Sequence, residues 1–513
     1  MSLATGTVLA LFAAVAVGTT SCTGAAPHDP PPPPASLAPR TRPAASGTSV
    51  LTGTPDVIAA GVAQRLFTSS PVVVVASPDP TADLAAARQA LLAHAPLLLT
   101  SAPPGGAASG PSPRTTAVVT AILRTQISAL DPHVVLAVGV AAKMLAAELP
   151  GLRVVASPAG LPATKAPAPL GHLALLVHPG DSDAATLAAV TTARVAGAHV
   201  IAVRGDDPRA DPAAIAALSA IRPQQVLAIG SGFAPAGLLA SRIAVAQTGV
   251  QLPGGGQVLF PAHLLVALYG NPGTPSLGAL GQQDLQASIA RAREVAAAYR
   301  SLSRARVIPA FEIIATVAQA HPGPDGEYSY ESPVASLRPW VQRATAGGLY
   351  VILDLQPGRA SLLAQAKRYQ SLLELPDVGL ALDPEWKLAP GQLPLRQIGG
   401  VSITEVNSVV TWLAGLTARY RLPQKLLVLH QFRLSMIRNE HELDVRNDDL
   451  AILIHMDGQG TPGDKQQTWE TITRAAPAGV FFGWKNFYVK DHPMMGPRQT
   501  IMRTPRLSMI SYQ

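Results

Sequence analysis

The sequence predicts an α/β protein: tandem βαβ units that form parallel, doubly wound (flavodoxin-like) sheets, followed by a (β/α)8 barrel of the TIM type. Three observations lead to this prediction. Short runs of Val, Ile and Leu alternate with alanine-rich or amphipathic stretches, the pattern of parallel strands covered by helices. In the first half of the chain the pattern recurs with a period of roughly 90 to 100 residues. In the second half, a series of apolar runs ends in polar or acidic residues.

The N-terminus has the features of an exported protein held at a surface. Leu3 to Val17 is apolar but too short to span a bilayer comfortably, and small residues follow as far as Cys22. This segment resembles a bacterial lipoprotein signal, in which the cysteine carries the lipid. We interpret residues 1–22 as a signal and lipidation segment that attaches the protein to the outside of a membrane. Cleavage to a secreted protein and an uncleaved anchor are the alternatives.

Residues 23–53 are rich in proline and include the run Pro30 to Pro34. Such a composition cannot bury apolar surface and favours an extended, stiff chain. We therefore expect a disordered tether between the N-terminus and the first folded domain.

The first predicted domain, residues 54–250, contains two copies of one strand and helix pattern. The third strand of each copy ends in glycine, Gly139 and Gly230, but neither glycine belongs to a full dinucleotide-binding fingerprint, so no nucleotide cofactor is expected. In the first copy an alanine-rich helix is followed by Pro96-Leu-Leu-Leu-Thr100 and then by the strand that ends in Gly139. With these features the copies resemble the type 2 cell-wall-binding repeat of Gram-positive bacteria, which implies a wall polymer as partner; a plain scaffold is the alternative. The predicted strands are 72–79, 95–100 and 132–139 in the first copy, and 173–179, 198–203 and 223–230 in the second.

The second predicted domain, residues 257–513, begins after a glycine-rich break and has about the length of a (β/α)8 barrel. Amphipathic stretches separate its strands, but the seventh connection, 491–505, is short and irregular. A seven-stranded or distorted barrel therefore remains an alternative. The predicted strands are 264–271, 306–314, 350–356, 378–385, 425–431, 450–457, 479–486 and 507–513.

Polar side chains occur near the C-terminal end of nearly every predicted barrel strand, which is where barrel enzymes place their active sites. Residues two apart on a strand share a face, so Asp383 and Glu385 point the same way. We expect one mouth lined by carboxylates, histidines and aromatic rings, the composition of a sugar-binding cleft. The candidates are Tyr269, Asn271, Glu312, Asp354, Gln356, Asp383, Glu385, Trp386, His430, Gln431, His455, Asp457, Trp484, Lys485 and Tyr512.

Cleavage of a glycosidic bond needs a carboxylic acid for the leaving oxygen and a second group facing the cationic centre. The fourth strand, which ends in Asp383-Pro384-Glu385-Trp386, resembles the catalytic strand of family 18 glycoside hydrolases. That resemblance implies Glu385 as proton donor and Asp383 as its helper. It also matches Asp457 to an aspartate of the sixth strand and Tyr512 to an aromatic of the last, and Glu312 completes the set of candidate catalytic carboxylates.

The remaining alternatives concern the chemistry. The two earlier aspartates of the family motif are Val378 and Ala381 here, which favours a barrel that binds glycan without cleaving it. A metal hydrolase using His430, His455 and Asp457 is the second alternative, although no clustered metal-ligand spacing is present. Glu312 and the histidines could also be satisfied core residues. The net charge of +7 comes from 39 basic and 32 acidic residues without a basic block, so we expect no nucleic-acid partner. We expect a monomer.

Overall fold

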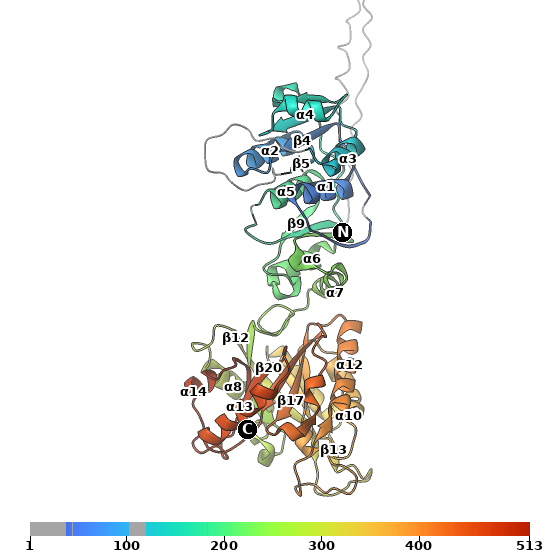
Figure 1. The fold of residues 1–513 in the computed structure, drawn as a ribbon. Coiled ribbons are helices and arrows are strands. Elements are labelled where there is room, and N and C mark those ends of the chain that lie inside the picture. Colours follow the sequence, from blue (N-terminus) through green and yellow to red (C-terminus); the bar gives the residue numbers. More distant parts are fainter. Residues whose placement is uncertain (1–36, 44, 102–118, 182) are drawn as a thin grey trace, which may run out of the picture.

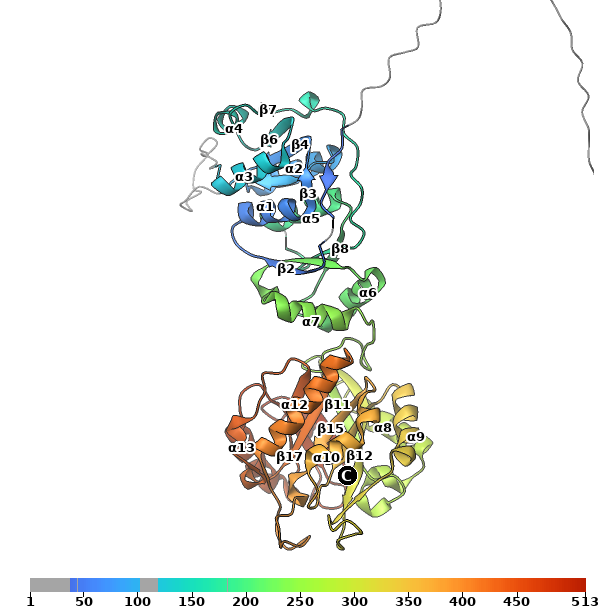
Figure 2. The same ribbon diagram turned by 90° about the vertical axis from the view of Figure 1, so that its right-hand side faces the viewer.

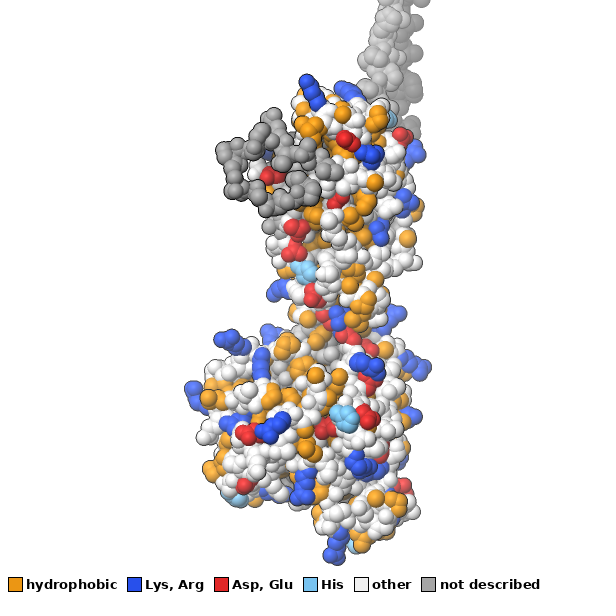
Figure 3. Space-filling model, in the orientation of Figure 1, with side chains coloured by type: hydrophobic (Ala, Val, Ile, Leu, Met, Phe, Trp, Pro, Cys, Tyr) orange, Lys and Arg blue, Asp and Glu red, His pale blue; other side chains and the backbone are white. Residues whose placement is uncertain are grey.

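The computed structural model describes residues 37–43, 45–101, 119–181 and 183–513. They form an N-terminal domain with two parallel sheets and a C-terminal barrel, arranged end to end (Figures 1, 2 and 3). None of the described helices is both long enough and apolar enough to cross a membrane.

Each main sheet of the N-terminal domain has four parallel strands, which confirms the predicted tandem βαβ units. In both sheets the first strand of the copy lies between its second and third strands. The first sheet contains, in order, β5 (Leu97–Leu99), β4 (Val72–Ala76), β6 (Val134–Val138) and β7 (Arg153–Val155), and the second contains β9 (His199–Ala202), β8 (Leu173–Val177), β10 (Gln225–Ile229) and β2 (Gly47–Leu51). A small antiparallel pair joins β1 (Arg40–Thr41) and β3 (Phe67–Ser69).

Helices separate and cover the two sheets. α1 (Pro55–Leu66) and α5 (Ala184–Val195) lie between them, because Val62 and Ala189 share one buried core with Val75 of β4 and Leu175 of β8. α6 and α7 cover the other face of the second sheet, on the side toward the barrel (Figure 2). The remaining bounds are α2 (Pro80–Leu92), α3 (Ala121–Leu130), α4 (Ala142–Glu148), α6 (Pro212–Ile221) and α7 (Ala236–Ala246).

The folded part begins before residue 54, which corrects the C-terminal end of the predicted tether. Gly47–Leu51 pairs with β10 at five successive positions, and Leu37 forms a bridge with Thr164. Without β2, the outer edge of β10 would have unpaired backbone groups. Gly47–Leu51 covers that edge with backbone hydrogen bonds, so this segment belongs to the folded domain. The predicted signal, Cys22 and the proline run fall in residues 1–36, outside the described residues.

The C-terminal domain is a closed barrel of eight parallel strands, as predicted, and the seven-stranded alternative is wrong. β11 pairs with both β12 and β21, which closes the ring. The strands are β11 (His263–Gly270), β12 (Arg306–Ala318), β14 (Tyr350–Leu355), β15 (Val378–Leu382), β17 (Lys425–Gln431), β19 (Leu450–Met456), β20 (Phe481–Asn486) and β21 (Leu507–Tyr512). Short strands outside the ring are β13 (Ser329–Glu331), β16 (Val401–Ser402) and β18 (Ile437–Arg438).

Helices surround the ring (Figure 2). Only one turn and a half of helix, α14 (Pro497–Ile501), occupies the seventh connection, where the sequence predicted a short and irregular segment. The other helices are α8 (Leu285–Ala297), α9 (Val334–Ala346), α10 (Leu362–Arg368), α11 (Gln370–Leu373), α12 (Ile403–Arg419) and α13 (Pro462–Ala475).

Alternate residues of the barrel strands point inward and fill the lower part of the ring. Ala267, Ile352 and Val428 belong to one apolar cluster with Leu259 and Phe260, which lie in the loop before β11 and close the N-terminal end of the barrel. The residues between them, such as Val266 and Leu353, belong instead to the core shared with the outer helices.

The N-terminal domain contacts the N-terminal end of the barrel. Arg209, only 2% exposed, binds Asp448 at 2.6 Å, and Arg242 binds the same carboxylate at 2.8 Å. Asp448 lies just before β19. The opposite end of the barrel, where its strands finish, therefore faces away from the N-terminal domain (Figure 1).

Candidate active site

Polar residues form the uppermost inward-facing layer of the barrel. Ala267, Ala310, Ile352, Ala381, Val428, Leu453 and Met509 belong to the apolar cluster below. Two residues further along each strand the side chain on the same face is polar, because the side-chain period of a strand is two. The seven residues reached in this way are Tyr269, Glu312, Asp354, Asp383, His430, His455 and Ser511, and Lys485, two positions after Gly483 of β20, completes the layer.

His430 is the centre of this layer and is completely buried. Its Nε2 lies 2.9 Å from Glu312 Oε1, and its Nδ1 lies 3.1 Å from Asp457 Oδ2. Burial disfavours the charged imidazole, but the carboxylates of Glu312 and Asp457 outweigh that effect and raise the pKa of His430 well above its usual value. An imidazolium is therefore held between two carboxylates.

Lys485 supplies the second cation of the layer. Its Nζ lies 3.2 Å from both carboxylate oxygens of Asp457 and 3.4 Å from the centroid of the Tyr269 ring, a cation–π contact. Tyr269 in turn donates its hydroxyl to Asp354 at 2.8 Å and accepts from Gln356 at 3.3 Å. The layer is thus a connected polar network, in which two cations lie among several carboxylates.

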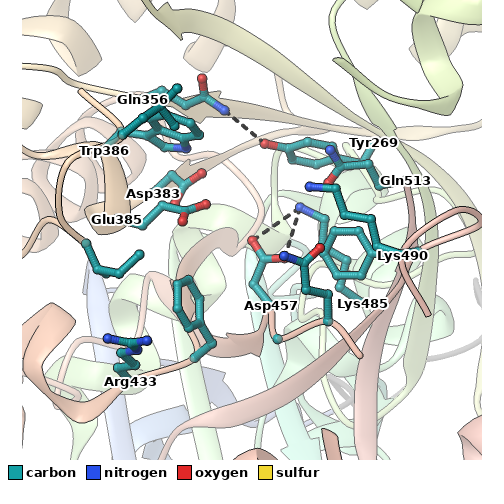
Figure 4. A pocket seen from close by; sticks show the side chains of 16 residues that line it. Tyr269, Gln356, Asp383, Glu385, Trp386, Arg433, Asp457, Lys485, Lys490 and Gln513 are labelled. Atoms are coloured by element: carbon teal, nitrogen blue, oxygen red, sulfur yellow. Dashed lines mark hydrogen bonds and ion pairs between the residues drawn. The ribbon is translucent and has the colours of Figure 1, made fainter. Parts of the chain in front are cut away.

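An open cavity of about 430 Å³ lies above this network, at the mouth of the barrel (Figure 4). Figure 4 shows Glu385 and Asp383 on one side of it, and Asp457 with Lys485 on the other. Of the predicted residues, those lining the cavity are Tyr269, Gln356, Asp383, Glu385, Trp386, Asp457 and Lys485.

Glu385 has the properties of an acid near neutral pH. β15 ends at Leu382, and a 3-10 turn over Pro384–Trp386 carries the Glu385 side chain to the cavity. Burial and then the negative charge of Asp457 raise the pKa of Glu385 to about 7, although Lys485 opposes the rise. The carboxyl is therefore substantially protonated at neutral pH, which a general acid requires.

Asp457 has the opposite character. Burial disfavours its charge, but Lys485 and His430 outweigh that effect and hold the pKa of Asp457 below its usual range. Asp383 resembles Glu385: burial, then the charges of Glu385 and Asp354, raise its pKa well above the ordinary value. One face of the cavity thus carries two carboxyl groups with raised pKa values, and the other a carboxylate with a lowered pKa.

Four predicted residues lie beneath the cavity lining instead of in it. Glu312, Asp354, His430 and His455 are completely buried and do not line the cavity. Glu312 pairs with His430 inside the barrel, as the alternative of a satisfied buried residue had allowed. Burial lowers the pKa of His455 to about 4, and its Nε2 lies 2.8 Å from Ser511 Oγ. Asp354 contacts Tyr269 of the cavity lining, and His430 contacts Asp457 of the lining.

Four further predictions are corrected, because these side chains point to the outside of the ring or away from its mouth. Trp484 is buried against Trp469 of α13. The Tyr512 hydroxyl lies 2.5 Å from that of Tyr299 in the outer core. Gln431 donates to Glu440, and Asn271 donates to the Ile314 carbonyl. None of the four lines the cavity, so a substrate there cannot stack on Trp484 or Tyr512.

Sequence reasoning missed the part of the lining that comes from loops. These residues follow β15, β17, β19, β20 and β21, and no periodic pattern marks them; the only available signal was their place after a strand end. They are Leu395, Ile398, Phe432, Arg433, Gly458, Gln459, Phe487, Lys490 and Gln513.

The site offers one arrangement that could bind a metal ion, and it differs from the predicted His430, His455 and Asp457. One oxygen each of Asp383, Glu385 and Asp457 lie within 4.8 Å of one another. Oxygen ligands of this kind suit Mg²⁺ or Ca²⁺. His430 does not fit as a ligand, because both of its nitrogens already face carboxylates.

Comparisons of the chain with protein-family models, with curated proteins and with solved structures found no match.

Proposed function

We propose that the protein is a surface-anchored carbohydrate-active hydrolase that cleaves a cell-envelope or extracellular glycan, with Glu385 as general acid. One observation carries the proposal: Glu385, with a pKa of about 7, faces an ionised Asp457 across an open cavity. Glycosidic cleavage needs that pair, since one carboxyl protonates the leaving oxygen while the other stabilises positive charge on the sugar.

The distance between Glu385 and Asp457 also bears on the stereochemical outcome of the reaction. An oxygen of Glu385 lies within 4.8 Å of one of Asp457. Inverting glycosidases separate their carboxyl groups by about 6.5–9.5 Å to admit a water, whereas retaining ones hold them about 5–5.5 Å apart. The short distance therefore favours retention of configuration. Trp386 lines the same cavity, and its half-buried ring suits stacking on a sugar face.

The rest of the chain supports the cellular side of the proposal. The resemblance of the two copies to wall-binding repeats would bring the barrel to a wall polymer, and lipid on Cys22 would tether it to a membrane. The barrel mouth faces away from the N-terminal domain, so such a tether leaves it open to substrate (Figure 1).

A metal-dependent hydrolase is the second candidate, because Asp383, Glu385 and Asp457 gather their oxygens closely. Against it, Lys485 already neutralises Asp457 at 3.2 Å. A glycan-binding protein without activity is the third candidate.

The full-length protein should release new reducing ends from at least one member of a panel of bacterial and plant polysaccharides. Dialysis against EDTA should leave that rate unchanged, since the general-acid mechanism uses no metal ion. Loss of activity in EDTA, with recovery on adding Mg²⁺ or Ca²⁺, would establish the metal-dependent candidate instead. Sedimentation of the protein with insoluble cell wall, with no product from any polysaccharide, would establish the non-catalytic one.

A further inference from the structure

A second cavity of about 390 Å³ adjoins the first at the barrel mouth. The two cavities have five lining residues in common: Glu385, Trp386, Leu395, Ile398 and Arg433. Glu385 therefore lies at their junction. Since a general acid acts on the bond between two sugar units, a junction of two cavities is the place where it must lie.

The charges of the two cavities differ. The first cavity contains Asp383 and Asp457 as well as Glu385, and its cations are Lys485, Lys490 and the shared Arg433. Glu385 is the only acidic residue among those described that line the second cavity. The second cavity contains two arginines, Arg396 and Arg433.

Both arginines are exposed and lack an anionic partner. Within the described residues, neither guanidinium forms an ion pair or a side-chain hydrogen bond, and the Arg433 guanidinium lies 5.9 Å from the centroid of the Phe432 ring. A guanidinium offers a planar fork of donors that matches a carboxylate or a phosphate. Two unpaired guanidinium groups at one cavity thus favour an anion there.

We propose that the second cavity binds the leaving-group side of the glycan, and that it selects a unit bearing a carboxylate or a phosphate. The assignment of sides follows from Asp457, which must face the sugar that becomes cationic and which lies in the first cavity. An anionic sugar in the first cavity would lie beside three acidic residues, whereas in the second it would meet Arg396, which lines only that cavity, together with the shared Arg433 and a single acidic residue. This inference rests on the proposed hydrolase function.

The reaction at the junction is a balanced hydrolysis. Glu385 transfers its proton to the glycosidic oxygen as the bond from that oxygen to the anomeric carbon breaks. The leaving sugar departs with a new hydroxyl from the second cavity. Water supplies a hydroxyl to the anomeric carbon and returns a proton to Glu385. Arg396 and Arg433 determine which sugar leaves, without touching the bond that breaks.

The test compares a uronate-containing polysaccharide, the same polymer with its carboxyl groups reduced to alcohols, and a polysaccharide with phosphodiester links. Release of reducing ends is measured for the full-length wild type and for a full-length double variant with Arg396→Gln and Arg433→Gln. The matched control is Arg300→Gln with Arg304→Gln, which removes the same charge from the exposed end of the α8 region. The acidic and the reduced polymer have nearly the same shape, so a difference between them reports recognition of the carboxylate. Preference for the third polymer would identify a phosphate as the ligand.

We expect the wild type to prefer one anionic polymer, and the Arg396 and Arg433 pair of substitutions to lower that preference about tenfold through KM, with the control unchanged. Equal KM values for the acidic and reduced polymers, with no preference for phosphodiester links, would overturn the inference while leaving the hydrolase function intact. If no polymer is cleaved, the hydrolase function fails, and binding of the same three polymers is measured by affinity electrophoresis. Arginine-dependent binding of an anionic polymer would still support the anionic site, whereas arginine-independent binding, or none, would overturn it.

Discussion

Glu385→Gln is expected to lower kcat on the substrate glycan by about 10²–10⁴-fold, the typical contribution of a general acid. Glutamine has nearly the same shape as glutamate but cannot donate an acidic proton to the leaving oxygen. The measurement is the initial rate of reducing-end release by the full-length protein. For the wild type, that rate should fall as the pH rises through about 7, because Glu385 loses its proton around its raised pKa and can then no longer act as an acid.

The matched control is Glu294→Gln, the same change at an exposed position of α8, which should leave the rate unaltered. Asp354→Asn gives a second comparison, since Asp354 is buried below the cavity and contacts Tyr269. An Asp354→Asn protein without activity beside a fully active Glu385→Gln protein would refute the assignment of Glu385.

His430→Gln is expected to lower the free energy of unfolding of the barrel by about 3–5 kcal/mol, the cost of leaving a buried charge without its partner. The substitution removes the cation that Glu312 contacts at 2.9 Å and Asp457 at 3.1 Å. Both carboxylates would then have to be protonated or remain charged in a buried site. Urea unfolding followed by tryptophan fluorescence measures the effect, because all five tryptophans lie in the barrel.

Glu312→Gln supplies the control for this prediction. When combined with His430→Gln, it removes the orphaned charge, so the double variant should be more stable than the sum of the two single losses implies. Additive losses would mean that Glu312 and His430 do not interact, and that the polar layer is not the connected network described above.

The barrel was predictable from sequence because each strand is a short apolar run with clear ends. The predicted strands at 306–314 and 425–431 correspond to β12 and β17, and the second has identical bounds. β2 could not be predicted, because Gly47–Leu51 has only two strongly apolar residues and follows a proline-rich stretch. Its pairing with β10 depends on a contact with residues about 180 positions away, which local pattern does not reveal.

The candidate site was predictable only where strand alternation could be applied. Asp383 and Glu385 do lie together, but through the 3-10 turn Pro384–Trp386, because β15 ends at Leu382 and not at Glu385 as predicted. Alternation could not decide between Trp484 and Lys485, which point to opposite sides of β20. Inward direction is set by the closure of the ring, and this turns Lys485 to Asp457 and Trp484 to α13. Arg433 lies in a loop, where conformation depends on packing and no periodicity applies.

The central claim is that burial and Asp457 keep Glu385 protonated near neutral pH at an open cavity. A carbon-13 NMR titration of glutamate side-chain carboxyls, with the Glu385 signal assigned from its absence in Glu385→Gln, tests this claim directly and needs no substrate. The account predicts that Glu385 titrates with a pKa of about 7. A pKa at the ordinary value of 4.5 would contradict it, since Glu385 would then be ionised and unable to serve as the acid.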